Sequence, residues 1–100
     1  MIKHLDLWTI KRSSDGRDKE ENIRLMTEML MQLPGKIPAI REFEVVRNVN
    51  PDERNMEVAL VSVFESLEAL NEYLVHPEHR KVGEFISSVT EKRSVIDYEF

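Results

Sequence analysis

Three histidines are the side chains in this sequence best suited to proton transfer: His4, His76 and His79. Imidazole titrates near neutral pH, so a histidine that faces a cavity can act as a general base. His79 is spaced to share one helical face with Val82 and Ile86, and we expect it to point inward with them. The alternative is a core histidine that caps a helix end or bonds to a backbone carbonyl. His76 directly precedes a proline, which favours a capping role.

An acidic residue lies close to the first histidine. His4 and Asp6 are two positions apart in a segment expected to be a strand, so both should project from one face about 7 Å apart along the strand. At that distance a carboxylate could orient or charge an imidazole. Alternatively, Asp6 lies near the solvent-facing end of the strand or pairs with an arginine, because an unpaired Asp is rarely fully buried.

Other kinds of chemistry find little support in the sequence. The four side chains His4, Asp6, His76 and His79 are of types that bind divalent ions, but their spacing fixes no ligand geometry, and we expect no metal. There is no cysteine, which excludes disulfides, thiolate metal sites and thiol nucleophiles. There is also no Gly-rich phosphate loop, and we expect no cofactor. One further group is interpreted as adaptable core or pocket lining: Met26, Met29, Leu30 and Met31.

Composition limits the protein class. The chain has 100 residues, of which 41% are hydrophobic and 33% charged, and we expect one domain over residues 1–100. The net charge of −5, with both signs interspersed, argues against nucleic acid as a partner. No apolar run approaches the roughly 18 to 20 residues needed to cross a bilayer, so we expect no membrane association. The amino-terminal residues do not resemble a signal peptide, and a cytoplasmic location is the default expectation.

Hydrophobic periodicity predicts the elements that must position these residues. Alternating patterns predict strands over residues 2–11, 40–48, 56–65 and 94–100. Between them, helical spacing predicts one helix after Asp18, ending near Pro34, and a second region after Ser66 that is split at Pro77. The order is β-α-β-β-α-β with a split second helix, which is the α+β ferredoxin-like arrangement with a four-stranded antiparallel sheet.

The helix faces are predicted from the same spacing. Asp18 and Glu21 have the pattern of a capping box. The expected apolar face of the first helix consists of Ile23, Met26, Leu30 and Leu33. That of the second consists of Leu67, Leu70 and Leu74, and that of the third consists of Val82, Phe85, Ile86 and Val89.

The strands carry apolar residues in both phases, which bears on assembly. In the first strand Trp8 and Ile10 alternate with Leu5 and Leu7, so both faces of the sheet are apolar. Helices from one chain can cover only one face, and the other would be a large exposed apolar patch. We therefore expect a homodimer in which two such sheets pack face to face about a two-fold axis.

Several motifs in order along the chain carry a resemblance to a known family. They are Met1-Ile2-Lys3-His4, Pro34-Gly35-Lys36-Ile37-Pro38, Phe64-Glu65-Ser66, Tyr73-Leu74-Val75-His76-Pro77-Glu78-His79 and Asp97-Tyr98-Glu99. Together they resemble the stress-responsive A/B barrel (Dabb) family of dimeric α/β barrels. The resemblance implies a small dimer, in many members of unassigned activity and in a few plant members a polyketide cyclase.

The resemblance to the cyclases also implies candidate catalytic residues. By motif position His79 and Tyr73 resemble the acid-base histidine and tyrosine of the cyclase pocket, and His4 resembles a supporting histidine. Two positions depart from the pattern: Leu30 falls where the cyclases have a second pocket tyrosine, and Asp6 falls where relatives usually have an apolar residue.

These observations lead to one functional hypothesis and two alternatives. The first is a cofactor-free homodimer of unassigned activity, either linked to a stress response or binding a small apolar ligand in a pocket between helices and sheet. The second is a cofactor-independent cyclase or lyase that uses His79 and Tyr73 as acid-base groups, supported by His4. The third, a cofactor-independent monooxygenase on a similar dimeric barrel, rests on analogy of fold alone.

Overall fold

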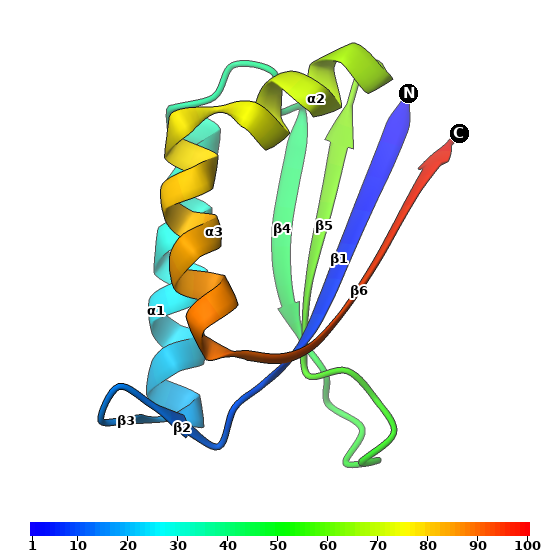
Figure 1. The fold of residues 1–100 in the computed structure, drawn as a ribbon. Coiled ribbons are helices and arrows are strands. Elements are labelled where there is room, and N and C mark those ends of the chain that lie inside the picture. Colours follow the sequence, from blue (N-terminus) through cyan, green and yellow to red (C-terminus); the bar gives the residue numbers. More distant parts are fainter.

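A four-stranded antiparallel sheet forms one layer of the protein in the computed structural model, which describes residues 1–100. The strand order is β4-β5-β1-β6. The strands are β1 (Ile2–Ile10), β4 (Glu42–Arg47), β5 (Val58–Phe64) and β6 (Thr90–Glu99). Figure 1 shows β1 and β6 side by side, with both chain ends at the same edge of the molecule. The predicted ferredoxin-like α+β fold is therefore confirmed, although β6 begins four residues earlier than the sequence pattern indicated.

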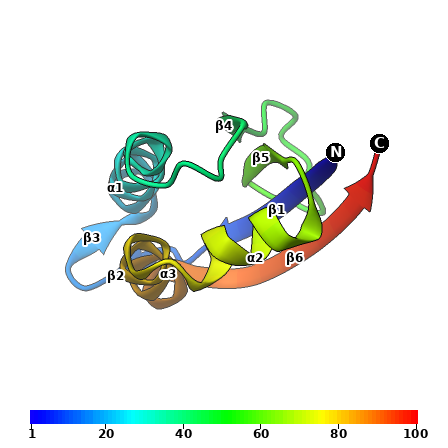
Figure 2. The ribbon, with the colours of Figure 1, turned by 90° about the horizontal axis from the view of Figure 1, so that it is seen from above.

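Three α-helices form the second layer, on one side of the sheet. They are α1 (Lys19–Met31), α2 (Leu67–Val75) and α3 (Pro77–Val89), and a short 3-10 turn η1 (Leu33–Gly35) follows α1. Figure 2, viewed from above, shows α1 and α3 next to each other on the same side of the strands. A small hairpin of β2 (Ser13–Ser14) and β3 (Arg17–Asp18) precedes α1. Its turn places Gly16 at φ 77°, a conformation that glycine adopts without steric cost.

The predicted helix starts are present, with one difference in detail. The Asp18 side chain accepts a hydrogen bond from the Glu21 N–H at 2.9 Å and so caps α1. The Glu21 carboxylate pairs with Arg24 instead of returning to Asp18, so only half of the capping box forms. At α2, the Ser66 hydroxyl accepts from the Ala69 N–H at 3.1 Å, as expected.

The apolar face predicted for α2 is wrong at one position. Leu67, the first residue of the helix, is 66% exposed and lies outside its buried face. The residues of α2 that are buried are Leu70 and Tyr73, which the helix turns toward β1 and β5. The inward face of α2 is therefore partly aromatic, and it places a phenol inside the protein.

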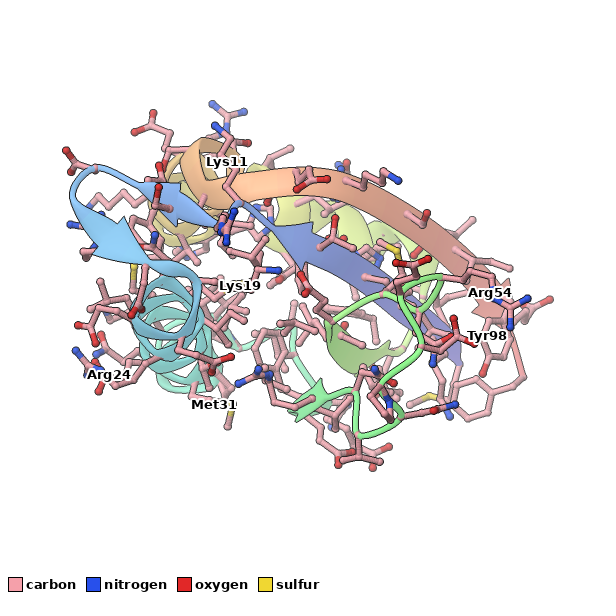
Figure 3. The ribbon with its side chains drawn as sticks, turned by 90° about the horizontal axis from the view of Figure 1, so that it is seen from below. Lys11, Lys19, Arg24, Met31, Arg54 and Tyr98 are labelled. Carbon is pink, nitrogen blue, oxygen red and sulfur yellow. The ribbon has the colours of Figure 1, made fainter.

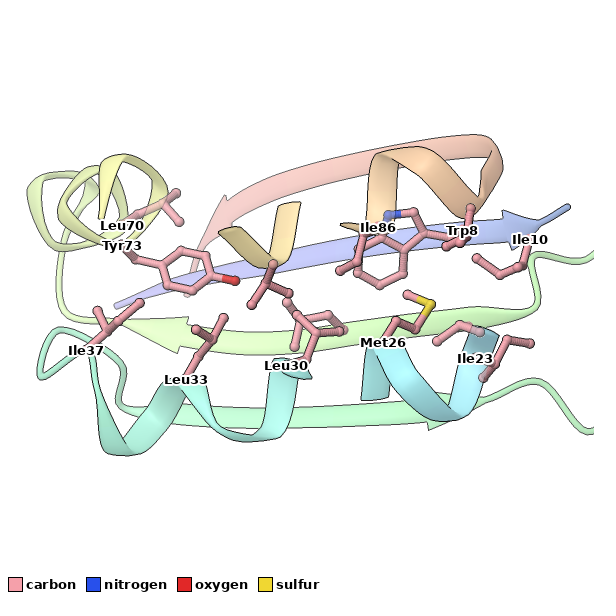
Figure 4. Packing of buried hydrophobic residues seen from close by; sticks show 14 of the residues in the cluster. Trp8, Ile10, Ile23, Met26, Leu30, Leu33, Ile37, Leu70, Tyr73 and Ile86 are labelled. Atoms are coloured by element: carbon pink, nitrogen blue, oxygen red, sulfur yellow. The ribbon is translucent and has the colours of Figure 1, made fainter. Parts of the chain in front are cut away.

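The hydrophobic core lies between the helices and the inner face of the sheet (Figure 4). Ile10, Met26, Phe64 and Val89 are completely buried there, and they come from β1, α1, β5 and α3. In β1, buried residues alternate with half-buried ones along its whole length. His4, Asp6 and Trp8 belong to the buried phase, so the two polar residues share the helix-covered face with the core.

The opposite face of the sheet is apolar and carries no helix. Leu5 lies opposite Val61 of β5 and Ile96 of β6 in the strand register. Ile96 is 55% exposed, and Tyr98, two residues further along β6, is 40% exposed. A single copy of the chain thus leaves a continuous set of apolar side chains uncovered on this face.

Charged side chains are spread over the remaining surface. Figure 3 labels Lys19 and Arg24 of α1 and Arg54 of the loop between β4 and β5, and each of these pairs with an acidic neighbour. None of the helices has the length and the apolar character that a bilayer-spanning segment needs.

Candidate functional site

A cavity of about 720 Å³ lies between α3 and the inner face of the sheet. Its apolar wall consists of Trp8, Leu30, Leu60, Leu74, Val82 and Ile86. The polar groups that reach it include Tyr73 and His79 together with Asp6 and Arg93. An apolar cavity with a few convergent polar groups is the usual form of a small-molecule site.

Tyr73 and His79 meet at the junction between α2 and α3. Their ring centroids are 4.4 Å apart, with the ring planes inclined by 54°. The junction is built by His76, which ends α2 in an extended conformation and whose Nδ1 accepts the Glu78 N–H at 3.1 Å. Pro77 then begins α3, where its fixed φ and missing N–H are tolerated. The capping role expected for His76 is confirmed, and the resulting turn brings the two rings together.

A hydrogen bond fixes the orientation of the His79 ring. Its Nδ1 lies 3.0 Å from the Leu74 carbonyl oxygen, and since a carbonyl only accepts, Nδ1 carries the proton. The other ring nitrogen, Nε2, then has a free lone pair in the neutral form and no hydrogen-bond partner in the protein. Burial lowers the pKa of His79 below its ordinary value of 6.5. At neutral pH this histidine is therefore a neutral side chain with one nitrogen able to accept a proton.

Tyr73 is 1% exposed, yet its hydroxyl has no hydrogen-bond partner in the protein. The hydroxyl oxygen keeps some accessible surface, and because Tyr73 lines the cavity, this surface faces the cavity. Figure 4 shows the ring extending from α2 into the layer between sheet and helices, with the oxygen at its inner end. Burial, reinforced by the negative charge of Asp6, raises the pKa of Tyr73 well above its usual value. The phenol thus stays protonated and can donate a hydrogen bond.

His4 lies behind Tyr73 and does not itself line the cavity. Its ring is 2% exposed, with its centroid 6.3 Å from that of Tyr73. Its Nδ1 is hydrogen bonded to the Asp97 carboxylate of β6. Its Nε2 is 3.8 Å from a carboxylate oxygen of Asp6. The expected proximity of His4 and Asp6 is therefore present, and His4 contacts the ring of Tyr73 without reaching the cavity itself.

Asp6 is held by an arginine, which was one of the two alternatives for this residue. Arg93 donates from Nε to one carboxylate oxygen at 2.9 Å and from Nη2 to the other at 2.8 Å. The Asp6 side chain is 8% exposed, so this bidentate pair supplies the counter-charge that a buried carboxylate needs. The pair also raises the pKa of Arg93, chiefly through the hydrogen bonds to Asp6.

Arg93 and Asp97 are site residues that the sequence analysis missed. In the register of β1 with β6, Arg93 lies opposite Trp8, and Asp97 lies opposite His4. Both side chains share the inner face with Asp6 because alternate residues of a strand face the same way. The only indication in the sequence was an Arg and an Asp four positions apart in the last strand. Their partners, Asp6 and His4, are set by strand pairing and could not be predicted from the sequence.

Two further expectations concern metal and methionines. His76 is engaged as a helix cap, and no group of three or more His, Asp or Glu side chains is arranged to hold a metal ion. Met26 is buried in the core and Leu30 lines the cavity, as expected. Met31 does neither, because it is 48% exposed at the end of α1.

The fold is a ferredoxin-like α+β arrangement with a cavity beneath its helices, and the sequence places the chain in a named group. The protein belongs to the stress responsive A/B barrel domain family, whose model matches residues 2–100. The resemblance noted in the sequence is confirmed.

Individual relatives are similar along nearly their full lengths. A dimeric protein of unknown function with a ferredoxin-like fold from Bacteroides fragilis is 36% identical, with 99% of this chain and 95% of that chain covered and a TM-score of 0.82. Olivetolic acid cyclase of Cannabis sativa is 28% identical over 100 residues, which cover 97% of this chain and 94% of the cyclase. Hydroxynitrile lyase from Passiflora edulis is 15% identical, with 97% and 90% covered and a TM-score of 0.80, and shares the fold.

Proposed function

We propose that this protein binds a small, largely apolar carbonyl compound in the cavity beneath α3, and that His79 and Tyr73 act on it as an acid-base pair. The reaction class is proton abstraction next to a carbonyl group, as a cofactor-independent cyclase or lyase requires. The observation that carries the proposal is the pairing of a neutral imidazole with a protonated phenol at the wall of one cavity, with their ring centroids 4.4 Å apart.

The protonation states suit these two roles. The free Nε2 of His79 would take a proton from the carbon beside the carbonyl group, and the Tyr73 hydroxyl would donate a hydrogen bond to the carbonyl oxygen as negative charge develops on it. When the proton returns from His79 to the substrate, both groups recover their starting states. The apolar wall would exclude water, and His4 with Asp97 would hold the Tyr73 ring from behind.

The sequence relative supports this choice over a bare scaffold. The Cannabis sativa protein is a cyclase by name, and its similarity covers 97% of this chain. Leu30 on the cavity wall, in place of a second phenol, leaves this cavity with one tyrosine hydroxyl and more apolar surface. A substrate with fewer polar groups than a poly-keto chain would fit such a lining.

The same proposal includes a homodimer through the open face of the sheet. Solved relatives from Bacteroides fragilis and Thermobifida fusca are described as dimeric. In this chain, the uncovered apolar residues around Leu5 and Ile96 are the surface that a second copy would bury. The cavity lies on the other side of the sheet, so dimer formation would leave it open to ligand.

The experiment measures exchange of carbon-bound hydrogen for deuterium in 4-phenylbutan-2-one, followed by proton NMR in D2O. We expect the wild-type protein to accelerate exchange at the carbons beside the carbonyl group. His79→Gln should remove about 10²- to 10⁴-fold of that acceleration, because general base catalysis is worth that much. Gln can still donate to the Leu74 carbonyl, so fold and ligand binding should persist.

Two variants complete the test. Tyr73→Phe should lower the exchange rate without loss of binding, because only the hydroxyl is removed. His76→Asn should leave the exchange rate unchanged, since His76 is a helix cap outside the cavity and Asn is also a good cap. If His79→Gln exchanges hydrogen as fast as the wild type, the catalytic role is wrong, and binding alone would describe the cavity.

A further inference from the structure

The unsatisfied hydrogen-bonding groups around the cavity are mostly donors. The Tyr73 hydroxyl is free, and two arginines, Arg80 of α3 and Arg93 of β6, also line the cavity. The Asp6 carboxylate lines it as well, but both of its oxygens are already occupied by Arg93. A ligand that satisfies these groups must itself supply acceptor oxygens.

Arg93 is positioned to hold an anionic oxygen while it remains bound to Asp6. A guanidinium group has five N–H donors, of which Asp6 takes two, so about three remain. The Arg93 side chain is 54% exposed, whereas that of Asp6 is 8% exposed. The carboxylate of the pair is therefore buried, and the guanidinium remains accessible to a ligand. The bidentate contact fixes the plane of the guanidinium, which lowers the entropy lost when a second oxygen binds.

Arg80 of α3 supplies a second positive charge at the cavity. Its backbone N–H bonds to the His76 carbonyl, and its guanidinium makes no ion pair. Glu84, four residues further along α3, also lines the cavity without an ion pair, and both Arg80 and Glu84 are exposed. The lining thus carries two arginines and two carboxylates, of which only Arg93 and Asp6 are paired with each other.

We propose that the ligand of this cavity is a small organic acid, with an apolar body against the α3 side of the core and a carboxylate held by Arg93 and Arg80. This inference rests on the proposed ligand-binding cavity and adds the charge of its ligand. Asp6 is then a positioning residue: it orients Arg93 toward the cavity and does not touch the ligand. The apolar wall of Trp8, Leu30 and Ile86 receives the body of the acid.

The test compares two probes of the same shape, 4-butylbenzoate and its uncharged amide, 4-butylbenzamide. Trp8 is the single tryptophan of the chain and lines the cavity, so its fluorescence reports binding. We expect the wild-type protein to bind the carboxylate at least about tenfold more tightly than the amide, as a charge-assisted hydrogen bond provides. Isothermal titration calorimetry measures the same two affinities independently.

The variants separate the role of Arg93 from general damage to the fold. In Asp6→Asn combined with Arg93→Gln, both charges of the buried pair are removed together, so no unpaired charge remains inside. This variant should lose the preference for the carboxylate and keep the affinity for the amide. Arg80→Gln should lose part of the preference, and Lys11→Gln, a charge change outside the cavity, should lose none.

The outcomes distinguish the two proposals. Equal affinity of the wild-type protein for both probes would overturn the inference about charge and leave the ligand cavity standing. A preference for the carboxylate that survives in the double variant would overturn the role of Arg93. Failure of both probes to bind the wild-type protein would overturn the cavity proposal together with this inference.

Discussion

The His79 ring packs against the Tyr73 ring at a centroid distance of 4.4 Å, and its Nδ1 is bonded to the carbonyl oxygen of Leu74, the residue that follows Tyr73. One segment at the end of α2 therefore fixes both the position and the tautomer of the histidine. Because Nδ1 is committed to this contact, any proton that His79 accepts must go to Nε2.

The first prediction concerns the dependence of stability on pH. Burial lowers the pKa of His79 in the folded protein, whereas in the unfolded chain it is near 6.5. Between those two values the unfolded chain binds the proton and the folded protein does not, so this contribution to stability is complete above pH 6.5 and is lost as the pH falls through the folded-state pKa.

Urea denaturation at several pH values between about 7.5 and 5.5 checks this effect, with carboxylates still ionised over most of that range. The wild-type protein should lose more unfolding free energy toward the acidic end than His79→Gln, which has no titrating group at that position. If the unfolding free energies of the two proteins change with pH in the same way, the folded state does not disfavour protonation of His79.

The second prediction concerns the core beneath α2. Phe64 is completely buried and its ring lies 5.1 Å from that of Tyr73. Phe64→Ala should lower the free energy of unfolding by about 3 to 5 kcal/mol, because it removes a buried aromatic ring and leaves a cavity. Chemical denaturation measures the change. A loss below about 1 kcal/mol is typical of surface positions and would contradict the burial of this ring.

The third prediction concerns the dimer. Sedimentation at micromolar concentration should give twice the chain mass of 11.8 kDa for the wild-type protein. Leu5→Glu places a charge at the centre of the open sheet face, opposite Val61 and Ile96, and should shift the protein toward monomer. Leu67→Glu is the control, since Leu67 is exposed on α2. A wild-type protein that sediments as a folded monomer would refute the proposed interface.

The fourth prediction concerns the buried ion pair. Arg93→Gln removes the counter-charge of Asp6 and should cost about 1 to 3 kcal/mol of unfolding free energy. We expect the lower part of that range, because the Arg93 side chain is half exposed and water screens the pair.

Replacing both residues of the pair, Asp6→Leu with Arg93→Leu, should recover most of that loss, since apolar residues often replace buried ion pairs without a net cost. Denaturant unfolding of the wild type, Asp6→Leu, Arg93→Leu and the double leucine variant gives the interaction energy of the pair. An additive cycle would mean that Asp6 and Arg93 act independently.

The order of the elements, the helix starts and the burial of most core residues were predictable from the sequence alone. The alternation in β1 and the helical spacing around Ile23 and Ile86 follow from the local geometry of strands and helices, so they can be recognised from the sequence. The cap at His76 was predictable for the same reason, because it acts on a residue two positions away. Leu67 was not, because periodicity alone does not say where the first turn of α2 stands relative to the sheet.

The polar centre of the site was decided by tertiary structure. Arg93 lies 87 positions from Asp6, and Asp97 lies 93 positions from His4, and each pair meets because β6 lies antiparallel to β1 in one particular register. A shift of that register by one residue would turn Arg93 and Asp97 to the other face of the sheet. The sequence determined which side chains could share the helix-covered face, and the strand pairing determined their partners, because register is set by packing between distant segments and not by local spacing.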